Sequence, residues 1–228
     1  MAEESESSSE LTPTESHFWI GSFPFLESSL LICPSFVLSG TSSLRFFDPD
    51  GMLCNQAQVE FKSGAVGVME LAQFIEGCKL EAGLKHAHLE VTSPPGTRHL
   101  LRVHTREGAA VVGEPVKIKR NKGAFYPVTF AADRSALLCF VNSGNSEALV
   151  KCRLYVANRT PETLLTVPPY GSRVISLKAE FIDYIAERES MLIPGYVRLT
   201  TKSPDLIGVQ LLEHNSTTKD NEFYCSVS

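Results

Sequence analysis

The sequence lacks the short motifs that mark nucleotide-binding and hydrolytic enzymes. Its 228 residues contain no G-x-G-x-x-G, no phosphate-binding loop, no G-x-S-x-G and no H-E-x-x-H. The six cysteines include no C-x-x-C pair, the spacing from which structural zinc sites usually draw their ligands. We therefore expect a protein that is not an enzyme, that uses no cofactor and whose function is binding.

Long apolar runs and an excess of basic residues are also missing. The longest apolar run, 30–38, is interrupted by Cys33-Pro34-Ser35 and is far shorter than the ~20 residues that span a membrane, so we expect no membrane insertion. The net charge is -5, and residues 1–16 hold five of the 26 acidic residues and no basic one. The remaining chain is neutral, which argues against nucleic-acid binding driven by phosphate neutralisation.

The first sixteen residues are acidic and rich in serine, so they predict a disordered, solubilising arm. A secretory signal would instead begin with positive charge followed by an apolar stretch. We therefore expect a cytoplasmic protein whose cysteines are reduced and mostly buried. A disulfide between Cys139 and Cys152, if their strands pair, is the alternative.

The two halves of the sequence repeat one pattern in the same order, which indicates a duplication. Five blocks match at offsets that stay between 106 and 110 residues: 29–33 with 135–139, 44–47 with 152–155, 68–71 with 174–177, 89–94 with 199–204, and His104 with His214. The chain therefore divides into the arm, a first repeat over 17–128 and a second repeat over 129–228.

Each repeat reads as a set of short strands. Apolar Val150, Cys152 and Leu154 alternate with polar residues, the period of two that places them on one face of a sheet. Turn signals follow at short intervals, at 48–51, 94–96, 142–145 and 168–171. The sequence predicts an all-β fold of two tandem antiparallel β-sandwiches, immunoglobulin-like or jelly-roll-like, each with one short helix, within 70–78 and 178–189.

Two segments have both a structural and a functional interpretation. Residues 117–122 are basic and favour an edge strand, whose lysines discourage pairing with other sheets; nucleic-acid contact is the alternative. Residues 17–25 concentrate aromatic side chains and favour a first strand packed on the sandwich; an exposed strip for a partner is the alternative. The segment 48–51 begins like a calcium loop but lacks its closing acidic residue, so we expect a hairpin turn there.

A histidine cluster is the candidate metal site. If the turn at 94–96 folds the next strand back, His86 lies opposite His104 and His88 lies opposite Arg102, outside the core. Three imidazoles within reach across two strands could hold zinc. The second repeat has Tyr196 and Arg198 in place of His86 and His88, so we favour a solvated strand face over a metal site.

The segments 136–155, 168–177, 196–204 and 210–214 together resemble the soluble transducer of microbial sensory rhodopsin and related small β-sandwich modules. In the first repeat, His104-Thr-Arg106 resembles a His-Thr-Arg ending in that family, whereas the second repeat has His214-Asn-Ser216. The resemblance covers 136–215 well and 29–106 loosely. It implies a non-enzymatic cytosolic sandwich that self-associates and binds a signalling partner or a small ligand.

The duplication keeps His104 in register with His214 and Arg45 in register with Arg153. The candidate binding residues are His104, Arg106, His214, Arg45, Arg153, Tyr196 and Arg198. We expect an adaptor that acts in signalling or assembly through contacts with a protein partner or with itself. The alternatives are a module that binds carbohydrate or a small ligand with Tyr155, Tyr196 and Arg198, a structural subunit of a larger assembly, and a metal-dependent enzyme built on the histidine cluster.

Overall fold

The computed structural model of the chain describes residues 12–22, 27–35, 39–78, 80–81, 84–104, 109–120, 122–132, 134–185, 192–215 and 222–226. For residues 80, 81, 84, 135, 214, 215 and 222–226 it describes the backbone alone. Strands make up most of the described chain and form four antiparallel sheets, which confirms the all-β fold class with sheets packed as sandwiches.

The first sandwich consists of two sheets, which we name I and II. Sheet I has the spatial order β1 (Thr14–Ser22), β7 (Leu84–Ser93), β3 (Gly40–Phe47) and β4 (Leu53–Phe61), and β6 (Leu80–Glu81) pairs with β7. Sheet II has the order β5 (Gly67–Glu70), β2 (Glu27–Cys33), β8 (Arg98–His104) and β9 (Ala109–Val112). Phe18, Leu44, Leu30 and Leu101 belong to the core of this sandwich.

The second sandwich consists of sheets III and IV. Sheet III has the order β11 (Ala124–Phe130), β16 (Ile193–Thr201), β13 (Ala148–Val156) and β14 (Glu162–Val167). Sheet IV has the order β10 (Val116–Lys117), β17 (Ile207–Asn215), β12 (Arg134–Asn142) and β15 (Ser172–Ser176), and β18 (Glu222–Ser226) pairs with β17. On β13, Val150, Cys152 and Leu154 are fully buried and their neighbours are not, as the alternation predicts.

The second sandwich repeats the strand order of the first. The strands β11, β16, β13 and β14 of sheet III correspond to β1, β7, β3 and β4, and β15, β12, β17 and β18 of sheet IV correspond to β5, β2, β8 and β9. Short helices follow equivalent strands: α1 (Ala72–Ile75) follows β5, and α2 (Leu177–Glu180) and α3 (Ile182–Ile185) follow β15. The boundary expected between residues 128 and 129 falls inside β11, which pairs with β16 along its length.

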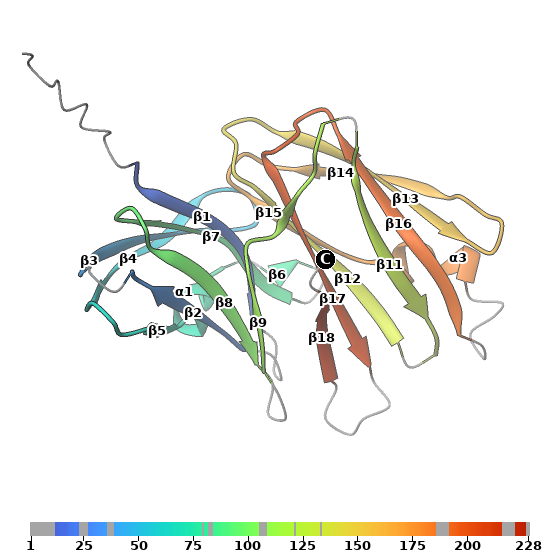
Figure 1. Cartoon of the computed structure of the whole chain (residues 1–228). Helices are drawn as coiled ribbons and strands as arrows, with labels where there is room; N and C mark the ends of the chain where they lie inside the picture. The colour runs from blue at the N-terminus through green and yellow to red at the C-terminus, as the bar shows by residue number, and fades with distance from the viewer. Residues whose placement is uncertain are drawn as a thin grey trace, which may run out of the picture.

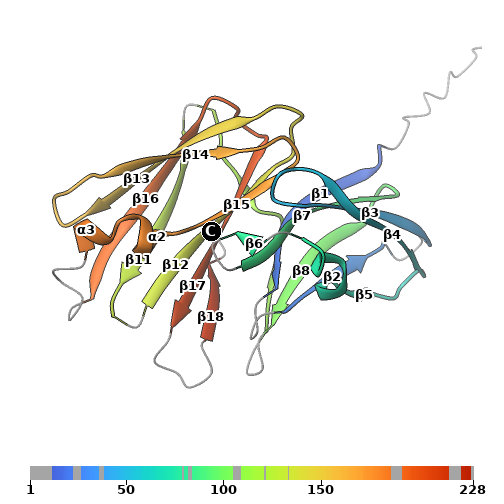
Figure 2. The same cartoon turned by 180° about the vertical axis from the view of Figure 1, so that it is seen from behind.

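The outer face of sheet I packs against the outer face of sheet IV, and we call this contact the seam. Trp19 of β1 is buried in one apolar cluster with Cys139, Val141, Val174 and Leu212 of the second sandwich. Figures 1 and 2 show the two sandwiches side by side, with β1 and β7 next to β12, β15 and β17. The strand β12 is therefore apolar on both faces because one face lines its own core and the other lies in the seam.

The turns at 48–51 and 168–171, both predicted from the sequence, lie against each other at one end of the seam. The Asp48 carboxylate accepts hydrogen bonds from the backbone N–H groups of Asp50 (3.0 Å) and Met52 (2.9 Å), which shapes the β3–β4 hairpin turn. The carbonyl oxygen of Pro49 in that turn accepts from the N–H of Ser172 (3.2 Å) and from the Arg173 guanidinium (2.7 Å). The hairpin prediction is confirmed, and the turn also connects the two sandwiches.

The basic and the aromatic segments both have structural roles within the described chain. The strand β10 lies at one end of the order of sheet IV and covers only Val116–Lys117, and Ile118 is buried. Phe18, Trp19 and Ile20 are buried in β1, so the aromatic segment is a packed first strand as expected; Phe23 and Phe25 lie outside the described residues. None of the helices found in the described ranges is long and apolar enough to cross a membrane.

Two glycines with a left-handed backbone give a matched test of the seam. Gly51 has a φ of +84°, and a Cβ added there would overlap the carbonyl oxygen of Pro169 across the seam; Gly64 has a φ of +72° with nothing within 4 Å. We expect Gly64→Ala to lower the free energy of unfolding by about 1 kcal/mol, the cost of the left-handed backbone alone. We expect Gly51→Ala to lower it by about 3 kcal/mol, because the turns must also separate. Urea unfolding measures both values, and equal losses would contradict a close seam.

Candidate functional site

The histidine cluster expected from residues 86–104 does not form. The strand β7 lies in sheet I and β8 in sheet II, so the turn at 94–96 carries the chain from one layer of the sandwich to the other. His86 and His88 therefore do not face His104 and Arg102, and the hairpin interpretation is wrong. A Pro-Pro-Gly turn can close a hairpin or join two sheets, and the sequence does not distinguish these geometries.

His86 and His88 are also fully buried, with no exposed surface. They lie on the face of β7 opposite Leu89, as the alternation predicts, but that face is not solvated. The second sandwich covers it: the ring of His86 is 2.9 Å from the Ser172 hydroxyl, and its plane stacks on Trp19. The predicted solvent exposure is wrong because the covering sheet is remote in sequence.

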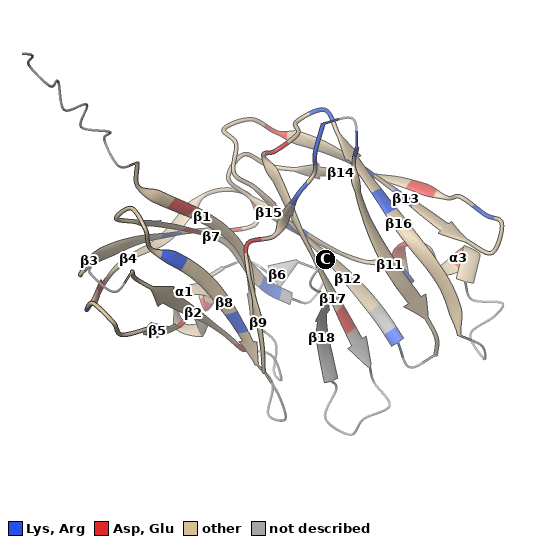
Figure 3. Cartoon of the chain, in the orientation of Figure 1, with Lys and Arg blue, Asp and Glu red and all other residues tan. Residues whose placement is uncertain are grey.

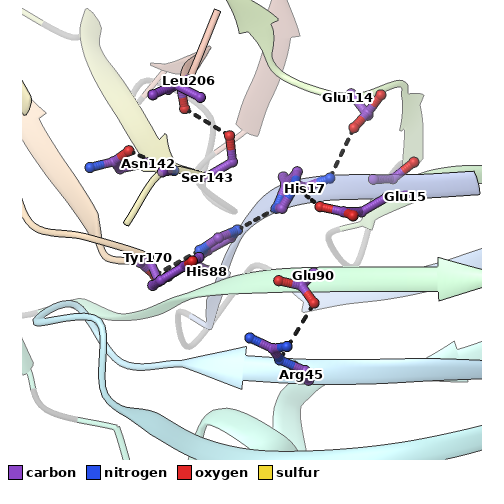
Figure 4. A network of polar contacts seen from close by, with 12 residues as sticks. Glu15, His17, Arg45, His88, Glu90, Glu114, Asn142, Ser143, Tyr170 and Leu206 are labelled. Atoms are coloured by element: carbon purple, nitrogen blue, oxygen red, sulfur yellow. Dashed lines mark hydrogen bonds and ion pairs between the residues drawn. The ribbon is translucent and has the colours of Figure 1, made fainter. Parts of the chain in front are cut away.

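A chain of hydrogen bonds runs through the seam (Figure 4). The Nδ1 atom of His88 is 2.7 Å from the carbonyl oxygen of Tyr170, and its Nε2 atom is 2.9 Å from Nδ1 of His17. A carbonyl only accepts, so His88 carries its proton on Nδ1 and accepts from His17 at Nε2. The Nε2 atom of His17 then lies 2.7 Å from a carboxylate oxygen of Glu15. Burial lowers the pKa of His88 to about 3, which keeps this ring neutral at pH 7.

Acidic side chains lie near His17, and the atoms of Glu15, His17 and Glu90 that could bind a metal ion lie within 4.8 Å of one another. Each of these groups already has a partner in the protein. Glu15 bonds the imidazole of His17, and the Arg45 guanidinium lies 3.4 Å from the Glu90 carboxylate and 5.0 Å from the centre of the Phe47 ring. Arg45, a predicted binding residue, thus contacts two residues of its own sheet I and remains exposed itself.

His104 lies on the outer face of sheet II in a second polar group. Its Nε2 atom is 3.2 Å from the Ser29 hydroxyl, and its Nδ1 atom is 3.9 Å from a Glu27 carboxylate oxygen. The residue types are those of a serine hydrolase, but Ser29 is fully buried and its hydroxyl lies 3.0 Å from both carboxylate oxygens of Glu70. The single hydroxyl proton is directed to that carboxylate, so the group does not present a nucleophile to solvent. Glu27, Glu70 and His104 are also close enough to hold a cation.

Three predicted binding residues, Arg153, Tyr196 and Arg198, do meet, on the outer face of sheet III. Arg153 pairs with Arg198 across β13 and β16, and the next pair on this face is Tyr155 with Tyr196. The two tyrosine rings stack with centres 4.5 Å apart, and the Arg198 guanidinium lies 5.6 Å from the centre of the Phe125 ring. We call this surface the arginine–tyrosine face; its members are Phe125, Lys151, Arg153, Tyr155, Tyr196 and Arg198.

The arginine–tyrosine face carries an excess of positive charge. Its three cations face one carboxylate, Glu162, which lies 2.6 Å from the Arg153 guanidinium and 3.0 Å from the Lys151 ammonium. Hydrogen bonds from Arg153 and Lys151 lower the pKa of Glu162, and a hydrogen bond from Arg153 lowers the pKa of Tyr155. Lys151, Arg153, Arg198 and Thr200 line a shallow hollow of about 160 Å³. These donors suit an anionic group of a partner. Elsewhere charges of both signs are interspersed over the strands (Figure 3).

The structure leaves the other predicted residues without a described side chain. Arg106 lies outside the described residues, and His214 is described by its backbone alone. The sequence did not single out Phe125 or Lys151, although the register of β11 and β13 with β16 places both beside Arg198. No model of a known protein family matches the chain, and no curated protein matches it significantly. The resemblance to the soluble transducer of microbial sensory rhodopsin therefore stays a prediction.

The pKa of His88 predicts how the seam responds to acid. Its folded-state pKa of about 3 lies below the ordinary value of 6.5, so the unfolded chain binds a proton first as the pH falls. Lowering the pH from 7 to 5 should therefore reduce the free energy of unfolding by about 2 kcal/mol through this histidine. We expect His88→Gln to remove that part of the pH dependence in urea unfolding. The control Leu154→Ala, a core change that removes no titrating group, should lower stability equally at both pH values, and an unchanged pH dependence in His88→Gln would contradict the assignment.

Proposed function

We propose that this chain is a non-catalytic binding protein that acts in assembly through protein–protein contacts, and that the arginine–tyrosine face is its docking surface. The observation that carries the proposal is the environment of equivalent faces in the two sandwiches. The outer face of sheet I is covered by a β-sheet in the seam, whereas the outer face of sheet III, its counterpart in the duplication, is open. Phe125 and Tyr196 on this open face are 52% and 43% exposed.

The correspondence extends to individual residues. Trp19 pairs with His88 in sheet I as Phe125 pairs with Arg198 in sheet III. In the same way, His88 pairs with Phe47 on β3, and Arg198 pairs with Arg153 on β13. By strand register, the seam residues Trp19, Phe47, His86 and His88 thus correspond to Phe125, Arg153, Tyr196 and Arg198. Large aromatic and arginine side chains at such positions are typical anchors of an interface.

The outer face of sheet II supplies a matching surface, because sheet II corresponds to sheet IV. Apolar side chains lie on it without full burial, with Val68 57% and Val111 50% exposed, and Leu31 and Leu100 half-buried. Glu27 and Glu70 add two exposed carboxylates to this face. Their charge is complementary to that of Lys151, Arg153 and Arg198. The partner that fits the arginine–tyrosine face is therefore sheet II of a second copy of this chain.

Such a contact would repeat the seam between molecules. Sheet III of one copy would meet sheet II of the next, as sheet I meets sheet IV within one chain. Because the two surfaces differ, the contact is heterologous and each added copy offers another open face. The chain would then act as a building unit that links head to tail, which unites the adaptor and assembly interpretations of the sequence.

Carbohydrate binding has less support from the geometry. A sugar usually stacks on the open flat face of an aromatic ring, but Tyr155 and Tyr196 stack on each other with an interplanar angle of 9°. Phe125 lies on the other side of Tyr196, at 6.3 Å between ring centres and 42° between planes. The polar atoms of this face are mainly donors, which favours a partner's carboxylates over a neutral sugar.

A pair of complementary variants tests the proposal. Arg198→Glu reverses a charge on the arginine–tyrosine face, and Val68→Asp places a charge on the outer face of sheet II. We expect the wild-type mass measured by light scattering to rise with concentration, and each variant alone to associate more weakly by at least about tenfold. An equal mixture should form a heterodimer of two 25.0 kDa chains, because each variant keeps one intact face. Tyr184→Asp, on helix α3 away from both faces, is the control and should associate like the wild type.

Two outcomes would overturn the proposal. A wild-type chain that remains a monomer at every concentration would show that a second copy is not the partner. Variants that each lose association but form no heterodimer on mixing would show that the two faces do not bind each other. Circular dichroism of each variant checks that the sandwiches remain folded.

A further inference from the structure

Two cysteines that are 24 residues apart in the sequence meet at the edge of the first sandwich. The sulfur of Cys54, on the edge strand β4, lies 3.3 Å from the sulfur of Cys78, which follows helix α1. Cys54 is exposed and Cys78 is buried, and both are free thiols. Among the described cysteines, the pair suspected from the sequence, Cys139 and Cys152, lies in two different sheets and is buried in two different clusters.

Local structure positions both thiols. In the ladder between β3 and β4, Phe46 pairs with Asn55 and Phe47 pairs with Leu53, so Cys54 is the extra residue of a β-bulge. A bulge changes the direction of a side chain relative to a regular strand. On the other side, the N–H of Cys78 donates to the carbonyl oxygen of Ile75 at 3.1 Å, which fixes the end of the helical turn. The approach of the two sulfurs therefore follows from a defined bulge and a defined helix end.

The hydrogen bonds assign different roles to the two thiols. The S–H of Cys54 donates to the carbonyl oxygen of Phe46 at 3.2 Å, so the S–H of Cys78 is left to donate to the sulfur of Cys54. Burial and the neighbouring Cys54 raise the pKa of Cys78 to about 12, so Cys78 stays protonated while it is buried. The exposed sulfur of Cys54 is the one that a dissolved oxidant can reach.

We propose that Cys54 and Cys78 form a reversible thiol–disulfide pair whose oxidant is a hydroperoxide. The thiolate of Cys54 attacks the terminal peroxide oxygen; the O–O bond breaks, an alcohol or water leaves, and Cys54 becomes a sulfenic acid. The sulfur of Cys78 then attacks the sulfur of that sulfenic acid. The S–S bond forms, the S–O bond breaks, and the hydroxyl leaves as water with the proton of Cys78. One peroxide thus takes two electrons from the two thiols, and a dithiol reductant restores them.

The disulfide would join the edge strand of sheet I to helix α1. Phe74 of that helix stacks on Phe46 of β3, the strand next to β4, with ring centres 4.8 Å apart, so the helix already packs against this sheet. The oxidised bond needs only a small approach of the sulfurs, and no strand has to leave its sheet. We expect oxidation to raise the melting temperature of the chain and to leave the arginine–tyrosine face unchanged.

Peptide mapping tests the pair directly. The full chain is treated with hydrogen peroxide, its remaining thiols are blocked with iodoacetamide under denaturing conditions, and it is digested with trypsin. Cys54 falls in the peptide 46–62 and Cys78 in the peptide 63–79, so the disulfide appears as one linked peptide that dithiothreitol separates. We expect this linked species in the wild type and in Cys33→Ser, and its loss in Cys54→Ser and in Cys78→Ser.

One control variant and two contrary outcomes complete the test. Cys33→Ser removes a half-buried thiol outside the pair and should leave the yield of linked peptide unchanged. A wild-type digest in which Cys54 is oxidised to the sulfinic acid while Cys78 takes up iodoacetamide would overturn the proposal. So would a linked peptide that joins Cys54 to another chain, which a mixture of isotope-labelled and unlabelled protein identifies.

Discussion

The structure depends on one interaction, the burial of the outer face of sheet I under sheet IV. In most sandwiches an outer face is polar and meets water, but here Trp19 and Phe47 lie on it beside the buried His86 and His88. These side chains could not remain in contact with water without exposing a large apolar patch. The seam removes that surface, and its hydrogen bonds satisfy the imidazoles that are buried with it. The two sandwiches are therefore parts of one folded body.

The duplication explains why two outer faces are left uncovered within one chain. Two copies of one sandwich joined in this way use the sheet I face of the first copy and the sheet IV face of the second. The sheet II and sheet III faces remain, and they belong to the same two types of surface. Both differ from the seam in composition: Tyr196 and Arg198 of sheet III stand where sheet I has His86 and His88, and Arg102 of sheet II stands where Leu212 of sheet IV lies in the seam. These two faces are more polar than the seam, and a more polar surface suits a contact that forms and separates.

The sequence was sufficient for the features that depend on near neighbours. Period-two alternation on β13 and the turn signal at Asp48–Gly51 predicted a strand and a hairpin, because both follow from local backbone geometry. The repeat predicted that the two halves share one strand order. The burial of His86 and His88 could not be predicted in this way, because it depends on a sheet more than 80 residues away. The Cys54–Cys78 pair was missed for a similar reason, since its spacing matches no motif and its geometry depends on a bulge.

The segment between the sandwiches has a mechanical consequence. It is not a flexible tether: β10 adds a short strand to sheet IV, and Glu114 just before it accepts a hydrogen bond from the backbone of His17 in the first sandwich. A tensile load along the molecule would thus have to peel β10 from its neighbour and shear the seam before either half could swing away. The two halves should therefore hold one relative orientation, so that surfaces on different sandwiches keep a constant separation.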